Sequence, residues 1–177
     1  MPRGTVYCIL GPNGAGKSTL LRIMTTITKP DTGTIAVEGL DTEKDTLRVR
    51  DQIGILAQEN HFDQYLTVWH NLVLHAQMHG MRKEEYEPRI TELLHSVGLY
   101  DRRLDFHDNY SGGMQRRAAL IRSLIHRPRV LFLDEPTTGL DPQARRDFWA
   151  LIHRLRDEGV TVLLTTHYLD EAEHLAD

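Results

Sequence analysis

The stretch that decides how this chain folds is Gly11-Pro12-Asn13-Gly14-Ala15-Gly16-Lys17-Ser18, followed by Thr19. It fits the pattern Gly-x-x-x-x-Gly-Lys-Ser/Thr, in which glycines let backbone N–H groups turn inward around phosphate oxygens. In such a loop Lys17 would reach the β- and γ-phosphates, Ser18 would hold Mg²⁺, and Thr19 could bind the α-phosphate. A glycine-rich turn without a ligand is the weaker alternative, because a chance match in a chain of this length is expected in well under about one case in fifty.

The surroundings of this phosphate loop predict the fold class. The apolar run Thr5–Leu10 precedes the loop as a buried strand, and the helical pattern Lys17–Ile27 follows it. Further buried strands are expected at Ile53–Ala57, Val130–Leu133 and Val160–Leu164, and further helices at Pro142–Asp157 and Tyr168–Ala176. The strands are almost continuously apolar, which is typical of parallel strands covered on both faces. Strands that alternate with helices predict an α/β fold with a mostly parallel sheet.

The middle of the chain has a different character, because residues 59–127 contain no good strand pattern. Helices are expected there at Thr67–His79, Glu84–Val97 and Ser111–His126. In the second of these helices, one face is marked at helical spacing by Ile90, Leu93, Leu94 and Val97. We therefore predict one domain over residues 1–177, with an α/β core formed by 1–58 and 128–177 and an all-helical subdomain at 59–127.

Composition narrows the possible functions. The chain has 177 residues, with 25 acidic and 21 basic side chains and a formal net charge of −4. This balance provides no broad basic footprint, so no nucleic-acid partner is expected. The single Cys8 cannot form an internal disulfide and is expected to be a small buried residue. No apolar run approaches the ~18 residues of a membrane span, so we expect a soluble chain that reaches a membrane only through a partner.

Two carboxylates follow the apolar residues of the expected strand Val130–Leu133. Asp134 and Glu135 lie at its carboxyl end, and in an α/β sheet that end faces the ligand crevice. Asp134 would support Mg²⁺, directly or through water, and Glu135 would accept a proton from the attacking water or orient it. Alone, the pair is equally well explained as a polar strand end before Pro136. Together with the phosphate loop, catalysis is the better interpretation.

Four further positions carry little weight individually. Ser111-Gly112-Gly113 would usually be a helix N-cap with flexible glycines, although a hydroxyl and bare glycine amides at a helix N-terminus can also grip a phosphate. Asp141-Pro142 is an ordinary helix start. Gln58 and His167 each follow an expected strand, and each alone could be a simple polar loop residue.

The order of these pieces is more informative than any one of them. The chain presents, in turn, a phosphate loop, a glutamine after a strand, a Ser-Gly-Gly helix, an Asp-Glu pair, a Leu-Asp turn and a histidine after a strand. This order resembles that of the ATP-binding cassette (ABC) ATPase family. By that resemblance Gln58 is the Q-loop glutamine, His167 is the H-loop histidine, and Gly139–Pro142 is the D-loop with Asp141. The signature segment Tyr110–Gln115 contains Ser111, Gly112, Gly113, Met114 and Gln115.

The resemblance implies a fold, a set of ligands and a set of partners. The fold would be a P-loop NTPase core whose helical insert carries the signature. Residues 11–19 would bind ATP, and the catalytic residues would be Glu135, His167 and Gln58. The implied Mg²⁺ ligands are Ser18, Gln58 and Asp134. Two such subunits would pair head to tail around ATP and energise an integral-membrane permease at the cytoplasmic face of the membrane.

Two short segments of the sequence are similar to those of ATP-binding subunits of drug exporters, such as the daunorubicin-resistance group. The matching segments are Tyr110–Met114 and Thr165–Glu173. Tyr110 and Met114 depart from the general family signature but are normal within this group. The transported molecule stays open, because the membrane subunit chooses it, and so does the choice between a homodimer and a heterodimer.

The chain also departs from the family at its ends. It begins only ten residues before Gly11, where the family has antiparallel strands and an aromatic that stacks on adenine, and it ends soon after His167. We therefore expect a cassette truncated at both ends, and an inert fragment that keeps the motifs without turnover is a rival hypothesis. A DNA-acting ABC ATPase is disfavoured because no heptads separate Gln58 from Ser111. A ribosome-acting one would need two cassettes.

Two further clusters lie outside these motifs. His75 and His79 are four residues apart on an expected helix, a spacing that can ligate a metal. No carboxylate or cysteine at a known spacing completes the set, so a solvated helix face is the favoured interpretation. A second cluster follows Gln58 closely and consists of Phe62, Tyr65, Leu66 and Trp69. Core packing of the helical insert and a groove for a transporter's coupling helix explain it equally well.

Overall fold

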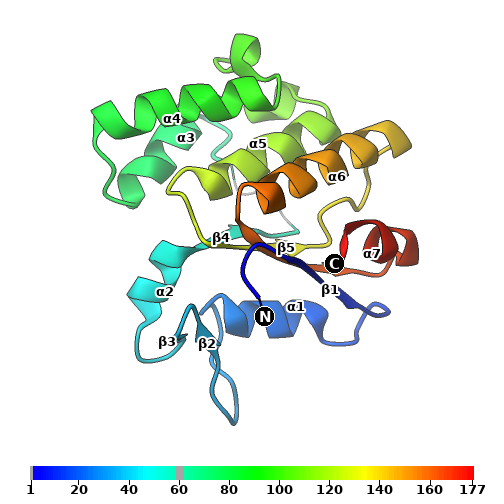
Figure 1. The fold of residues 1–177 in the computed structure, drawn as a ribbon. Helices are drawn as coiled ribbons and strands as arrows, with labels where there is room; N and C mark the ends of the chain where they lie inside the picture. Colours follow the sequence, from blue (N-terminus) through cyan, green and yellow to red (C-terminus); the bar gives the residue numbers. More distant parts are fainter. Residues whose placement is uncertain (1, 59–61) are drawn as a thin grey trace. The chain divides into compact units, whose positions relative to one another are not determined.

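Figure 1 shows the computed structural model, which describes residues 2–58 and 62–177. The chain divides into two compact units. The first, called the sheet unit, contains residues 2–58, 128–136 and 149–177. The second, called the helical unit, contains residues 62–127 and 137–148. Helix α6 (Pro142–Asp157) has residues in both units, and the predicted domain boundaries after 58 and 127 stay a prediction.

The sheet unit is built on four parallel strands in the order β1-β6-β5-β4. Their bounds are β1 Val6–Leu10, β4 Ile53–Leu56, β5 Val130–Asp134 and β6 Thr161–Thr166. Every residue of β6 is buried, as expected for a parallel strand covered on both faces. The four strands predicted from apolar runs are all present, and the predicted α/β fold with a parallel sheet is confirmed.

The register of the sheet determines which residues meet at its carboxyl edge. Leu10 of β1 pairs with Thr166 of β6, and Asp134 of β5 pairs with Thr165 of β6. Because parallel strands end at the same edge, the segments that follow them leave the sheet together. Those segments carry the phosphate loop, Gln58, Glu135 and His167.

Helices α1 (Lys17–Met24), α2 (Thr46–Gln52) and α7 (Leu169–Leu175) belong to the sheet unit, and Figure 1 shows α1 beneath the strands. A core cluster joins the sheet to α1, α2 and β2 (Ala36–Val37), and its members are Leu21, Val37, Val49, Ile53, Val130, Phe132 and Leu163. Tyr7 packs against this cluster, in agreement with the prediction of Thr5–Leu10 as a buried strand.

Three short elements of the sheet unit are absent from the sequence-based prediction: α2, β2 and β3 (Leu40–Asp41). β2 and β3 pair antiparallel over two residues each, and Glu38 and Gly39 join them at φ values of 52° and 79°. This is the conformation of a tight hairpin turn, for which Glu-Gly is a weaker signal than Asn-Gly. Strands of two residues show no alternation, and the seven residues of α2 are fewer than the window in which a helical period is measured.

The helical unit contains α3 (Val68–Met78), α4 (Lys83–Ser96), α5 (Gly112–Leu124) and the first part of α6. Two 3₁₀ helices, Tyr100–Arg102 and His107–Asn109, lie between α4 and α5. The packed faces are apolar stripes at helical spacing, and their buried members include Val68, Leu72, Ala76, Ile90, Leu93, Leu94, Leu120, Ile121 and Leu124. Over residues 62–127 the predicted absence of strands is confirmed, with only an isolated bridge between Thr67 and Phe106.

The cluster that follows Gln58 is divided by the structure. The Phe62 ring stacks on the His107 ring with centroids 4.3 Å apart, and the Arg122 guanidinium lies 4.8 Å from its centroid. Tyr65 is 81% exposed, whereas Leu66 and Trp69 are half-buried. Core packing therefore explains Phe62 but does not explain Tyr65.

The prediction that His75 and His79 lie on a solvated helix face is wrong. Both side chains are half-buried, and the His126 ring stacks on the His79 ring. His126 comes from the segment that follows α5, so the packing of α3 beside α5 creates a contact that the spacing of α3 alone does not reveal.

Two findings concern the predicted character of the whole chain. Among the helices of residues 2–58 and 62–177, none combines the length and the apolar character that crossing a bilayer requires. Cys8 is half-buried in β1, and burial raises the pKa of its thiol to about 11. The thiol is therefore protonated at neutral pH, which agrees with its prediction as a packing residue rather than a reactive one.

We expect Leu133→Ala to destabilise the chain by about 2–5 kcal/mol, because Leu133 is fully buried in β5 and truncation leaves a cavity. Leu47→Ala is the matched control, since Leu47 is 75% exposed on α2, and it should change stability by less than about 0.5 kcal/mol. Urea unfolding followed by circular dichroism measures both values. Equal losses in the two variants would contradict the assignment of Leu133 to the core.

Candidate active site

The phosphate loop connects β1 to α1 and depends on two glycines with left-handed backbone. Gly14 has φ 82° and Gly16 has φ 89°, and Gly16 is the N-cap of α1. A Cβ added at either position would meet nothing within 4 Å, so the requirement is conformational rather than steric. Residues with side chains rarely adopt this conformation, which explains why glycine occupies both positions.

Lys17 begins α1 and turns its side chain back onto the loop. Its Nζ donates hydrogen bonds to the carbonyl oxygens of Gly11, at 2.8 Å, and Pro12, at 3.1 Å. The same atom lies 3.5 Å from Oε1 of Glu135, and the Lys17 side chain is only 6% exposed. The loop therefore holds a largely buried positive charge next to the carboxyl edge of the sheet.

Asp134 is held by hydroxyl groups from two other elements. The Ser18 hydroxyl of α1 donates to its Oδ1 at 3.1 Å, and the Thr165 hydroxyl of β6 donates to the same atom at 2.6 Å. A carboxylate beside a hydroxyl offers the oxygen ligands that Mg²⁺ prefers. The residues present therefore fit a magnesium site, with Ser18 and Asp134 as its donors.

Glu135 lies between two groups that can carry positive charge. Its Oε1 lies 3.5 Å from Nζ of Lys17, and its Oε2 lies 3.3 Å from Nδ1 of His167. This second contact is a close approach rather than a hydrogen bond, because Nδ1 of His167 has no hydrogen-bond partner among the described parts of the chain. The Glu135 side chain is 11% exposed, so its carboxylate is shielded from solvent on most sides.

The backbone of Glu135 is itself unusual, with φ at 44°. A non-glycine residue in this region is strained, and such strain tends to occur at functional sites. The Glu135 N–H donates to the carbonyl oxygen of Thr165 at 3.1 Å, which helps to hold the turn. After this turn the carboxylate lies next to Lys17 and His167.

A hollow of about 320 Å³ opens beside these groups. Its lining consists of Asn13, Gly14, Gly16, Lys17, Ser18, Thr19, Gln58 and Glu135. The structure thus brings together most of the residues that the sequence nominates in the sheet unit, with Asp134 bonded to Ser18 and His167 in contact with Glu135. A helix N-terminus, loop amides and an ammonium around one hollow are a suitable cradle for phosphate groups.

The signature residues lie in the helical unit at the start of α5. Ser111 is the N-cap, and its hydroxyl accepts a hydrogen bond from the backbone N–H of Met114 at 3.4 Å. Gly113 is needed for close packing, because a Cβ there would lie 3.0 Å from the Cβ of Ala144 on α6. Gln115 donates from Nε2 to the carbonyl oxygen of His107 at 3.2 Å. Ser111 and Gly112 are exposed, which places the Ser111 hydroxyl and the start of α5 on the surface.

Asp141 caps the start of α6, as its position before Pro142 suggests. Its Oδ1 accepts hydrogen bonds from the backbone N–H groups of Gln143 and Ala144, both at 2.9 Å. These backbone donors, Ala144 first, hold the pKa of Asp141 below its usual value. The predicted D-loop residue therefore has a structural role in this unit as well.

Sequence reasoning missed Thr165 as part of the site. Its hydroxyl donates to Asp134 at 2.6 Å and also accepts from the Glu135 N–H at 3.2 Å, so it orients both carboxylate residues. The available signal was the polar pair Thr165-Thr166 at the end of a buried strand, directly before His167. A hydroxyl at that edge is a natural partner for a carboxylate at the end of the neighbouring strand.

Comparisons with known proteins agree with this geometry. A family model described as ABC transporter matches residues 1–138. A daunorubicin resistance ATP-binding protein of Streptomyces coeruleorubidus is 47% identical over 99% of this chain and 55% of its own length. The linearmycin resistance ATP-binding protein of Bacillus subtilis is 38% identical over 100% of this chain and 57% of its own length. The chain thus spans about half the length of these relatives, and the predicted resemblance to the daunorubicin-resistance group is confirmed.

Solved structures lead to the same family. The ATP-binding subunit of an ABC transporter superposes with a TM-score of 0.86 at 31% identity, covering 99% of this chain and 73% of that one. A subunit from Clostridium perfringens, described as part of the ABC transporter complex cbiONQ, superposes with a TM-score of 0.88 at 30% identity. That match covers 99% of this chain and 72% of the other.

We expect Thr165→Val to lower the free energy of unfolding by about 1–3 kcal/mol, because it removes a buried donor to Asp134 without changing the side-chain shape. Thr5→Val is the control, since the Thr5 hydroxyl only donates to the Pro2 carbonyl in an exposed bond. Urea unfolding at neutral pH measures both. If the two variants are equally stable, the Thr165 hydroxyl does not hold Asp134 in solution.

Proposed function

The chain belongs to the ABC transporter family, and we propose on that basis that it binds ATP and hydrolyses it to energise a membrane exporter. The observation that carries the proposal is the position of Glu135. Its carboxylate lies 3.5 Å from the phosphate-loop ammonium and 3.3 Å from the His167 ring, beside a hollow lined by the loop. A base, a cation and a phosphate cradle in one place are what phosphoryl transfer to water requires.

Nucleotide binding rests on the loop residues 11–19. The amides of the loop and the N-terminus of α1 would surround the β-phosphate. The Lys17 ammonium would offset negative charge on the β- and γ-phosphates, and the Thr19 hydroxyl would bind the α-phosphate. Lys17 is already placed for this, because the loop carbonyls of Gly11 and Pro12 hold its Nζ inside the loop.

A magnesium ion would be held by Ser18 and Asp134, with Gln58 lining the same hollow as Ser18. When bound, Mg²⁺ neutralises charge on the phosphate oxygens. Thr165 contributes by fixing the orientation of Asp134, since its hydroxyl donates to Oδ1 at 2.6 Å. Oxygen ligands from a hydroxyl, a carboxylate and an amide suit this ion better than they suit zinc.

Hydrolysis would use Glu135 as the general base. The oxygen of a water molecule attacks the γ-phosphorus, the bond from that phosphorus to the bridging oxygen breaks, and Glu135 accepts the proton of the water. The products are ADP and phosphate. His167 would orient the Glu135 carboxylate through their 3.3 Å contact, and Gln58 would help to position the water. The presence of these groups in one site favours a competent enzyme over an inert fragment.

A second ABC ATPase subunit would complete the site. Ser111, Gly112 and Gly113, followed by Met114 and Gln115, would face the γ-phosphate bound to the partner's loop, in a head-to-tail pair. In support, Ser111 and Gly112 are exposed, and the first turn of α5 contains no acidic residue to repel an anion. Asp141, which caps α6, would contact the partner near the same place.

An integral-membrane permease is the proposed transport partner, with this chain at the cytoplasmic face of the membrane. Support comes from the relatives, whose names refer to daunorubicin resistance, linearmycin resistance and Nod factor export. A structural neighbour is described as part of a transporter complex. We infer a small-molecule exporter, and no nucleic acid takes part in the proposed activity.

We expect Lys17→Ala to weaken MgATP binding about 10- to 150-fold, since a lost charge-assisted contact costs about 1.5–3 kcal/mol. Lys29→Ala is the matched control, because the Lys29 side chain is 86% exposed in the same unit, and its affinity should stay near that of the wild type. Titration calorimetry with MgATP measures both. Near-wild-type affinity of Lys17→Ala would remove this loop from the nucleotide site.

We expect Glu135→Gln, in the full-length protein, to slow ATP hydrolysis at least about 100-fold, because the amide cannot accept the proton of the water. ATP binding should persist, and an ATP-bound dimer should accumulate. Phosphate release and size-exclusion chromatography measure these effects, with Glu158→Gln as an exposed control on the same unit. Normal turnover of Glu135→Gln would show that another group is the base.

A further inference from the structure

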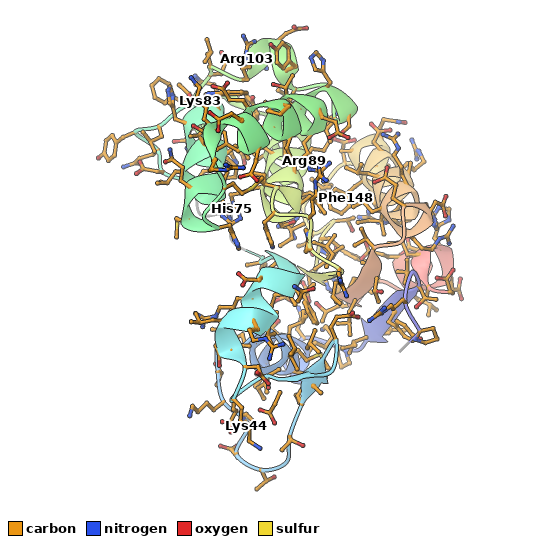
Figure 2. The ribbon with its side chains drawn as sticks, turned by 60° about the vertical axis from the view of Figure 1, so that its left-hand side comes forward. Lys44, His75, Lys83, Arg89, Arg103 and Phe148 are labelled. Carbon is orange, nitrogen blue, oxygen red and sulfur yellow. The ribbon has the colours of Figure 1, made fainter. Side chains whose placement is uncertain are left out.

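The helical unit contains a second group of ligand-type side chains, which the nucleotide site does not use. His75 lies on α3, His79 is the C-cap of that helix, and His126 follows α5. One ring nitrogen from each residue can be chosen so that all three lie within 4.8 Å of one another. Within residues 2–58 and 62–177 this is the one group of three or more potential metal ligands of this kind. Figure 2 labels His75 and shows the helix that carries it.

The backbone positions of the three histidines are well anchored. His75 and His79 are one helical turn apart, and the His79 N–H donates to the carbonyl oxygens of His75 and Ala76. Ala76, next to His75, and Ile125, next to His126, are both fully buried. The ends of α3 and α5 are therefore held together by their apolar neighbours, and the histidines meet whether or not a ligand is present.

The rings form a compact cluster. His79 and His126 are stacked, with centroids 3.9 Å apart and an interplanar angle of 4°. His75 is tilted against both, with centroids 4.8 Å from His79 and 5.9 Å from His126. Nε2 of His75 is buried and makes no hydrogen bond to any residue that the structure describes. A buried polar atom without a partner is costly and calls for an explanation such as a bound ion.

His75 is also in the protonation state that a metal needs. Burial, and then the nearby charges of His79, Arg122 and His126, lower the pKa of His75 to about 3. Its imidazole is therefore neutral at physiological pH and offers a lone pair. The Arg122 guanidinium opposes any cation here, so binding requires that imidazole ligation outweigh this repulsion.

One side of the cluster is open. His79 lines a hollow of about 530 Å³ together with Glu84, so water or a carboxylate can complete a coordination sphere. A tetrahedral zinc ion with Zn–N distances of 2.0–2.1 Å needs nitrogen atoms about 3.4 Å apart. The present limit of 4.8 Å therefore requires the rings to turn by a modest amount, which half-buried side chains allow.

We propose that His75, His79 and His126 form a binding site for one divalent transition-metal ion, with zinc as its first candidate. Imidazole donors suit zinc, nickel, copper and cobalt, whereas Mg²⁺ and Ca²⁺ require oxygen donors. The site is therefore chemically distinct from the magnesium site of the sheet unit. A metal held there links the end of α3 to the end of α5 and stabilises the folded helical unit, because the unfolded chain does not hold the three rings together.

The first test is zinc titration of the untagged 177-residue chain in the absence of nucleotide, with thermal unfolding in parallel. We expect one zinc ion per chain, with a dissociation constant in the micromolar range or below. The melting temperature should rise when zinc is added and return to its starting value when EDTA removes the zinc. Magnesium at the same concentration should have no such effect. Absence of zinc binding would overturn the proposal and leave three histidines that only pack against one another.

Single variants identify the ligands. His75→Gln, His79→Gln and His126→Gln should each weaken zinc binding about 10-fold or more, since even a lost partner of a ligand costs 10- to 100-fold. His153→Gln is the matched control, because His153 and His174 form another close pair, at 5.5 Å, to which no third histidine of residues 2–58 and 62–177 is added. Unchanged affinity in all three single variants would overturn the assignment.

Cobalt provides a readout that does not depend on stability. Bound Co²⁺ in a tetrahedral site absorbs strongly in the visible range, and this band should appear with the wild type and with His153→Gln. It should be lost in His79→Gln, which replaces a half-buried ring at the end of α3. Circular dichroism without metal verifies that each variant is folded. An equal cobalt band in His79→Gln would exclude this residue as a ligand.

Discussion

The parallel pairing of β1, β6 and β5 is the constraint on which the active site depends. The register places Leu10 beside Thr166 and Asp134 beside Thr165, so three strands end at one edge. The phosphate loop, the Asp-Glu pair and the histidine turn all begin there. A slip by one residue would reverse the direction of every side chain in a strand and remove Asp134 from Ser18. The continuous burial of β6 makes such a slip expensive.

The charges at this edge are arranged so that each one has a partner. Lys17 is nearly buried, and an isolated ammonium there would lose much of its hydration energy. Two loop carbonyls and the Glu135 carboxylate compensate for that loss. Glu135 in turn has a strained backbone, with φ at 44°. Its carboxylate faces both Lys17 and His167. The strain and the charge pairing together hold the Glu135 carboxylate beside the phosphate loop.

The helical unit is held together by the packing of apolar helix faces. Its described residues, 62–127 and 137–148, contain no strand of a sheet, so apolar stripes on α3, α4 and α5 determine where its side chains lie. Close packing explains Gly113, which leaves room for Ala144, and brings the ends of α3 and α5 together. The exposed hydroxyl of Ser111 and the histidine cluster are both consequences of this packing. Both lie at the end of a helix, where the backbone N–H or C=O groups of the terminal turn have no partner within the helix.

Local patterns in the sequence determined the α/β class, the four main strands, the long helices and the phosphate loop. Apolar runs, glycine spacing and helix caps are properties of neighbouring residues, so they can be read without a structure. The hairpin of β2 and β3 was too short to show such a pattern. Only the tertiary structure decided that Thr165 holds Asp134, that Glu135 lies between Lys17 and His167, and that His126 joins the α3 histidines. These contacts connect residues far apart in the chain, because strand register and helix packing create them and no local pattern encodes either.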